Sequence, residues 1–163
     1  MEFLIVSGLS GAGKSTVMSV LEDSGFFCVD NLPPLLIPKF AELCLAVTGT
    51  YERVAMACDI RGGENFDGLF EALDSLKEMQ FEYRILFVEA DTKTIIKRYQ
   101  ETRRSHPLMA ADGVNLVQAV ERERKAMEAV RQRADYVIDN SGTKEQLFRN
   151  VDAQIEALDR RLP

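Results

Sequence analysis

The sequence predicts an α/β domain in which a parallel sheet of five strands is covered by helices on both faces. Short apolar runs alternate along the chain with stretches of helical periodicity, the pattern that crossover helices on a parallel sheet produce. The first run enters a glycine-rich turn, and the later runs also stop at polar or turn-forming residues. The chain has 163 residues, 46% of them hydrophobic, which suits one compact domain with a buried core.

Five strands and six helices are expected. The strands are residues 3–6, 26–30, 54–60, 84–89 and 135–138. The helices are residues 14–23, 38–45, 66–79, 93–103, 116–133 and 143–162. Gly25 is placed to close the first helix in a left-handed conformation, and Asp91 with Thr92 fits the N-cap of the fourth helix. Residues 143–146 resemble a capping box at the start of the last helix.

Composition and charge exclude several classes of protein. The 26 acidic and 20 basic side chains leave a formal charge of −6, which argues against a nucleic-acid-binding surface over the whole body. Cys28, Cys44 and Cys58 lack metal-type spacing and predict buried thiols in a reducing cytosol. Because the apolar run at the N-terminus is too short for a signal peptide or a membrane span, a cytoplasmic protein without membrane contact is expected.

The glycine-rich turn carries the pattern G-x-x-x-x-G-K-[ST]. Its residues are Gly8, Leu9, Ser10, Gly11, Ala12, Gly13, Lys14 and Ser15, and Thr16 follows. Between a strand and a helix this pattern directs N–H groups at an anion, and Gly8 and Gly13 are expected at positive φ. Lys14 would supply charge to the β- and γ-phosphates of ATP or GTP, and Ser15 would ligate Mg²⁺. The turn therefore predicts the three-layer fold of P-loop NTPases and small kinases.

Triphosphate chemistry also needs a carboxylate near the metal, usually at the end of a neighbouring buried strand. Asp59 ends the third run and is the first candidate for this catalytic, magnesium-linked role. Asp59, Ile60, Arg61 and Gly62 also have the D-x-x-G spacing in which a glycine N–H reaches the γ-phosphate. Asp30 ends the second run and is the alternative, because in small kinases an acid there often faces the acceptor substrate or the metal.

Two adjacent arginines precede a break in helical periodicity at residues 106–115, which we interpret as a lid. Arg103 or Arg104 is a candidate catalytic cation for the transferring phosphoryl group, and the alternative role is to complement a helix C-terminus. His106 is expected to be structural rather than an acid–base group. The charges at 121–133 alternate in sign and predict a solvated helix face.

The turn after the fifth strand is the expected position of the nucleotide base. Asn140, Ser141 and Gly142 lie where P-loop kinases often place the base, and their backbone is expected to contact the purine edge. No N-K-x-D segment follows an apolar strand, so the sequence indicates no strict preference for guanine. ATP and GTP are both left open.

Five segments together resemble the RapZ/YvcJ family of bacterial nucleotide-binding proteins, an RNase adapter family. They are residues 8–16, 25–33, 59–63, 103–108 and 134–142. The resemblance covers the whole chain and implies binding and hydrolysis of ATP and GTP, with 8–15 as the ATP motif and 59–62 as the proposed GTP motif. Family members carry a further C-terminal domain, associated with small-RNA binding and delivery to an RNase. RNA and RNase partners are therefore implied only through a domain that this chain, ending at Pro163, lacks.

Three functions are compatible with these features. The leading hypothesis is the nucleotide-sensing half of a regulatory adapter that hydrolyses ATP or GTP slowly. The alternative is a kinase that transfers the γ-phosphate to a small metabolite, which the lid and Asp30 would suit. The third is an interaction domain in which nucleotide controls folding or homo-oligomer formation. Turnover without an acceptor distinguishes the first from the second.

Overall fold

The computed structural model describes residues 1–47, 49–58, 66–102, 105–106, 109 and 115–160. The strands are β1 (Glu2–Gly8), β2 (Phe27–Val29), β3 (Arg53–Ala57), β4 (Arg84–Glu89) and β5 (Tyr136–Asp139). The helices are α1 (Lys14–Asp23), α2 (Ile37–Ala46), α3 (Phe66–Glu78), α4 (Thr92–Thr102), α5 (Leu116–Arg133) and α6 (Lys144–Asp159), with a 3-10 turn η1 (Pro34–Leu36) before α2. The predicted order is confirmed, and the boundaries shift by at most three residues.

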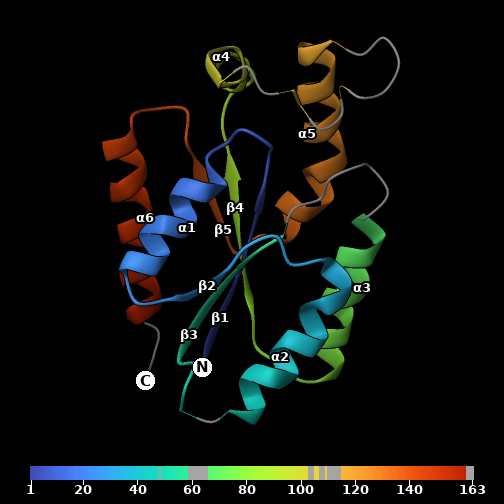
Figure 1. Ribbon diagram of the computed structural model, residues 1–163, viewed down its shortest axis with the longest axis vertical. Coiled ribbons are helices and arrows are strands. Elements are labelled where there is room, and N and C mark those ends of the chain that lie inside the picture. The colour runs from blue at the N-terminus through green and yellow to red at the C-terminus, as the bar shows by residue number, and fades with distance from the viewer. Residues whose placement is uncertain (48, 59–65, 103–104, 107–108, 110–114, 161–163) are drawn as a thin grey trace.

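The sheet is parallel throughout, with the strand order β2-β3-β1-β4-β5 (Figure 1). β1 is the central strand, and the chain first builds the sheet toward β2 and then crosses over to β4 and β5 on the other side. In open α/β sheets, ligands bind beyond the carboxyl ends of the strands where the strand order changes direction. The carboxyl end of β1 is that position, and the glycine-rich loop begins there.

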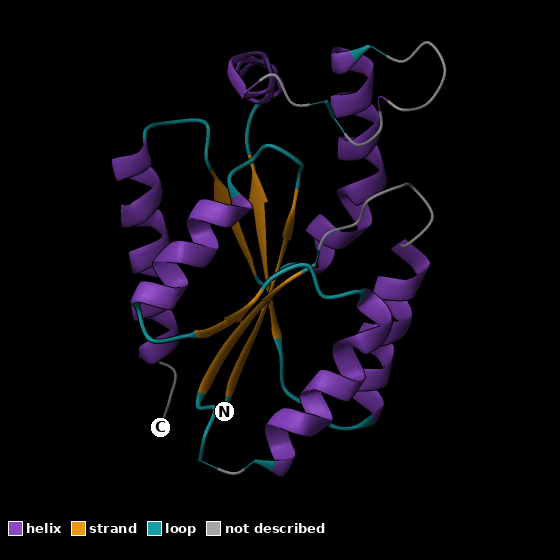
Figure 2. Ribbon diagram, viewed as in Figure 1, coloured by secondary structure: helices purple, strands orange, loops and turns teal. Residues whose placement is uncertain are grey.

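Helices cover both faces of the sheet, as the sequence predicts (Figure 2). α1 and α6 pack together on one face, whereas α2, α3 and α5 lie on the other. α4 packs against α5 near the carboxyl end of β4. Because both faces are covered, the central strands are buried on both sides, which explains why β1, β3 and β4 appear in the sequence as continuous apolar runs.

The predicted helix ends are confirmed. Gly25 has φ 92°, and the Asp91 carboxylate accepts the Thr94 N–H at 2.7 Å at the start of α4. Thr143 and Gln146 form both hydrogen bonds of the capping box of α6. The three cysteines are free, and Cys44 and Cys58 are buried. Within the described part of the chain, no helix combines the length and apolar composition that crossing a bilayer requires.

Candidate functional site

The loop from β1 to α1 has a backbone that only glycine accommodates. Gly8 has φ 145° and Gly13 has φ 98°, which confirms the expected positive φ at both positions. A Cβ at Gly8 would lie 2.1 Å from the Val88 carbonyl oxygen, and one at Gly13 would lie 2.4 Å from Asn140 Nδ2. Strand β4 and the turn after β5 therefore approach the loop too closely for a side chain at either glycine.

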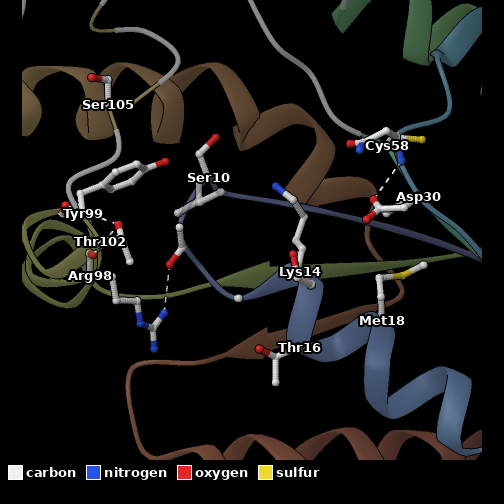
Figure 3. Close-up of a pocket in the computed structure, with 16 residues that line it drawn as sticks. Ser10, Lys14, Thr16, Met18, Asp30, Cys58, Arg98, Tyr99, Thr102 and Ser105 are labelled. Atoms are coloured by element: carbon white, nitrogen blue, oxygen red, sulfur yellow. Dashed lines mark hydrogen bonds between the residues drawn. The ribbon is translucent and has the colours of Figure 1, made fainter.

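The N-terminus of α1 faces the cleft above this loop. Gly13 is the N-cap and offers no side-chain cap, and the first helical hydrogen bond runs from Val17 N–H to the Gly13 carbonyl at 3.1 Å. Helix starts leave N–H groups without helical partners, and the helix dipole makes them a site for an anion. Lys14 Nζ donates to the Gly8 carbonyl at 2.8 Å, so the ammonium lies over the loop (Figure 3). Backbone dipoles and one cation converge there.

A cleft of about 1070 Å³ opens over the loop. Its floor is formed by residues of the loop and of the start of α1, among them Ser10, Lys14, Ser15 and Thr16. The rest of its described lining comes from the residues after β2, from the end of β3 and the residue after it, from α4 and Ser105, and from α1. These residues are Asp30, Asn31, Ala57, Cys58, Arg98, Tyr99, Thr102, Ser105 and Met18. Burial raises the pKa of the Cys58 thiol to about 12, so this sulfur stays neutral near physiological pH.

The loop is held by two polar side chains from distant elements. Asn140 is buried, and its Nδ2 donates to the Ala12 carbonyl at 2.8 Å. Arg98 of α4 donates from Nη1 to the Gly11 carbonyl at 3.1 Å and from Nη2 to the Asn140 carbonyl at 2.6 Å. Arg98 therefore joins the phosphate loop to the turn after β5. Arg98 is not among the site residues that the sequence predicts, because nothing in the sequence around α4 indicates these distant carbonyl partners.

Asn140→Ala is expected to destabilise the fold by about 1–3 kcal/mol, because the buried Ala12 carbonyl loses its amide donor. Urea denaturation of the variant and the wild type measures this difference. Asn150→Ala is the matched control, since Asn150 lies exposed on α6 and its removal is expected to be nearly neutral. Equal effects of the two substitutions would contradict this role of Asn140.

Glu123 of α5 is a buried acid that contacts the loop directly. Its carboxylate accepts the Ser10 N–H at 2.5 Å and the Ser10 hydroxyl at 2.7 Å, and His106 Nε2 lies 3.6 Å from it. Burial alone would raise the pKa of Glu123, but the nearby His106 imidazole and the hydrogen bonds from Ser10 outweigh burial and hold this pKa below its ordinary value. The group is therefore ionised at neutral pH.

The expectation of a solvated helix face at 121–133 is wrong at Glu123, which is only 8% exposed. Glu123 comes three residues after buried Val120 and four before buried Met127, so it occupies the apolar stripe of α5. A carboxylate within that stripe is the sequence signal that would have identified it.

Several candidate residues lie outside the described residues, and their roles stay predictions. They are Asp59, Ile60, Arg61, Gly62, Arg103 and Arg104.

In the turn after β5, the Asn140 N–H donates to the Glu89 carbonyl, and Ser141 Oγ accepts the Asp91 N–H. Contact of this turn, including Gly142, with a base also stays a prediction. His106 is buried and packs against Tyr99 with ring centroids 5.3 Å apart.

Solved structures identify the class of fold. A shikimate kinase from Acinetobacter baumannii in complex with shikimate superposes with a TM-score of 0.62 at 19% identity, covering 100% of this chain and 96% of that chain. A gluconokinase from Sinorhizobium meliloti 1021 gives a TM-score of 0.60 at 18% identity, covering 96% and 93%. At this identity the likeness shows the fold alone. The fold and the glycine loop define an α/β domain of the P-loop kinase type.

The family is shown by sequence. The chain belongs to the family described as the RapZ-like N-terminal domain, whose model matches residues 1–157. A nucleotide-binding protein of Clostridium novyi (strain NT) is 50% identical over 149 residues, covering 91% of this chain and 50% of that protein. A nucleotide-binding protein of Ruminiclostridium cellulolyticum is 53% identical over 141 residues, with coverages of 86% and 48%. The chain thus spans about half the length of these relatives.

Proposed function

We propose that this domain binds ATP or GTP with Mg²⁺ at residues 8–16, hydrolyses it slowly, and serves as the nucleotide-sensing half of a regulatory adapter. The observation that carries the proposal is the loop itself, in which Gly8 and Gly13 hold positive φ under a helix start while Lys14 lies above the backbone. A loop of this shape presents N–H groups and a cation to phosphates. The names of the relatives, which are nucleotide-binding proteins, support the same ligand class.

The residues present suit a magnesium-bound triphosphate. Ser15 is exposed at the first turn of α1 and lines the cleft, where its hydroxyl would hold the metal alongside phosphate oxygens. Asp59 is the proposed carboxylate on the metal side and follows Cys58, which lines the cleft. Arg103 or Arg104 would stabilise charge on the transferring phosphoryl group. RNA or RNase contacts are proposed only for the further C-terminal domain that the resemblance implies. Homo-oligomer formation is a second proposed response of the domain to bound nucleotide.

Slow release of inorganic phosphate from Mg–ATP or Mg–GTP without any acceptor tests the proposal. Ser15→Ala is expected to lower the rate at least tenfold and to raise the Mg²⁺ concentration required, because it removes a metal ligand. Ser75→Ala on α3, whose hydroxyl donates to the Glu71 carbonyl, is the control and is expected to keep the wild-type rate. Asp59→Asn, Arg103→Ala and Arg104→Ala extend the test, and a wild-type rate in any of them removes that residue from the mechanism. A wild-type protein that releases no phosphate would overturn the hydrolysis.

A metabolite kinase is the second candidate function, and it is favoured because the cleft extends from the phosphate loop to the residues after β2. Asp30 and Asn31 line the cleft beyond Lys14, and the exposed Asp30 carboxylate accepts the Asn31 N–H at 2.9 Å. A carboxylate in the lining of this cleft would accept the proton of an acceptor hydroxyl. A screen of small hydroxylated metabolites for phosphorylated products tests this function. A product that disappears in Asp30→Asn would establish the kinase, and a screen without product would reject it.

A further inference from the structure

Both polar hydrogens of Ser10 are directed at a buried carboxylate. Ser10 lines the cleft, and in Figure 3 its side chain rises from the loop on the same side as the Lys14 ammonium. Its N–H and its hydroxyl nevertheless both donate to Glu123, at 2.5 and 2.7 Å. The position between β1 and α1 that could have offered two donors to a phosphate group therefore offers them to α5.

The same contact places the negative charge of the Glu123 carboxylate next to the phosphate loop. Glu123 is 8% exposed, so water screens its charge less than that of the solvent-facing acids of α5, such as Glu128. Besides the two Ser10 donors, His106 Nε2 lies 3.6 Å from this carboxylate. Lys14 is the group that addresses the β- and γ-phosphates, and a γ-phosphate brings additional negative charge into this region.

We propose that Glu123 sets the preference of this site between nucleoside triphosphates and diphosphates. Its carboxylate repels the terminal phosphate and withholds the Ser10 donors, and both effects fall mainly on the γ-phosphate. The β-phosphate relies instead on the start of α1, whereas Glu123 accepts its hydrogen bonds from Ser10, before that helix. Glu123 thereby limits how far the site favours the triphosphate, which suits a sensor that must respond to the ratio of the two nucleotides. This inference rests on the proposed nucleotide binding.

A purely structural role makes a different prediction. If Glu123 served only to hold the loop in shape, its replacement would weaken triphosphate and diphosphate alike, because both use the same loop backbone. If its charge and its hold on Ser10 act on the γ-phosphate, a neutral side chain would strengthen triphosphate binding relative to diphosphate binding. The ratio of the two dissociation constants therefore distinguishes the roles, whatever happens to the absolute affinities.

The experiment is calorimetric titration of the wild type and Glu123→Gln with Mg²⁺ and either ADP or a non-hydrolysable ATP analogue, repeated with the guanine pair. Removing one poorly screened charge is expected to raise the preference for the triphosphate about tenfold. Glu128→Gln makes the same charge change on the exposed side of α5 and is expected to leave the preference unchanged. If Glu123→Gln does not fold, Glu123→Ala, which admits water to the Ser10 donors, takes its place with the same expected direction.

The outcomes separate the inference from the proposed function. A preference that stays within twofold of the wild type, or that shifts toward the diphosphate, overturns the role of Glu123 while nucleotide binding stands. An equal shift in Glu128→Gln also overturns it, because the effect would then be one of net charge. A wild-type protein that binds neither nucleotide removes the proposed function, and the inference with it.

Discussion

Gly8→Ala is expected to destabilise the fold by about 3 kcal/mol or more, because the new methyl group would clash with neighbouring backbone atoms. Its Cβ would lie 2.1 Å from the Val88 carbonyl oxygen, which is backbone of strand β4 rather than a flexible side chain. The residue also has φ 145°, a conformation that alanine rarely adopts. Urea denaturation followed by circular dichroism measures the loss, and nucleotide affinity is expected to fall in parallel.

Gly25→Ala separates the two contributions. Gly25 has φ 92°, but a Cβ there would meet no atom within 4 Å, so this variant carries conformational strain without a clash. Its expected cost is about 1 kcal/mol. If Gly8→Ala costs no more than Gly25→Ala, the close approach of the loop to β4 is not what requires a glycine.

Lys14→Ala is expected to weaken binding of Mg–ATP or Mg–GTP at least 100-fold while leaving the fold nearly as stable. The ammonium is the one side-chain cation on the loop, and its loss leaves the backbone N–H groups as the loop's remaining contribution to binding the phosphate charge. Calorimetric titration measures the affinity, and denaturation measures the stability. Lys39→Ala removes the same charge from α2, where the side chain is exposed and pairs with Glu42, and it is expected to bind as the wild type does. Comparable affinity loss in both variants would contradict a specific role for Lys14.

The sequence predicted those parts of the structure that depend on neighbours along the chain. The positions of the strands along the chain follow from continuous apolar runs. The helix caps at Gly25 and Thr143 follow from residue types at fixed positions relative to the helix ends. The phosphate loop is likewise a local pattern, and the positive φ of Gly8 and Gly13 was expected from it. Local geometry is encoded within a few residues and can therefore be recognised without the fold.

The supports of the loop could not be predicted in the same way. Ser10 and Glu123 are separated by 113 residues, and Ala12 and Asn140 by 128. Each contact therefore forms only when the tertiary fold brings these segments together. The sequence predicts that the backbone of Asn140 contacts a base, which stays a prediction, but it does not indicate that the Asn140 side chain holds the loop by donating to the buried Ala12 carbonyl. Glu123 was assigned to a solvated face because alternating charges conceal one acid within the apolar stripe of α5.

The central claim is that the loop at residues 8–16 is where the triphosphate binds. Titration of the ¹⁵N-labelled protein with Mg–ATP or Mg–GTP, followed through backbone amide shifts, tests it most directly. The largest shifts are expected at residues 11–16, where the loop passes into the start of α1, and they are expected to be absent from Lys14→Ala. Saturable shifts that centre on another part of the domain, or that persist unchanged in Lys14→Ala, would contradict the claim.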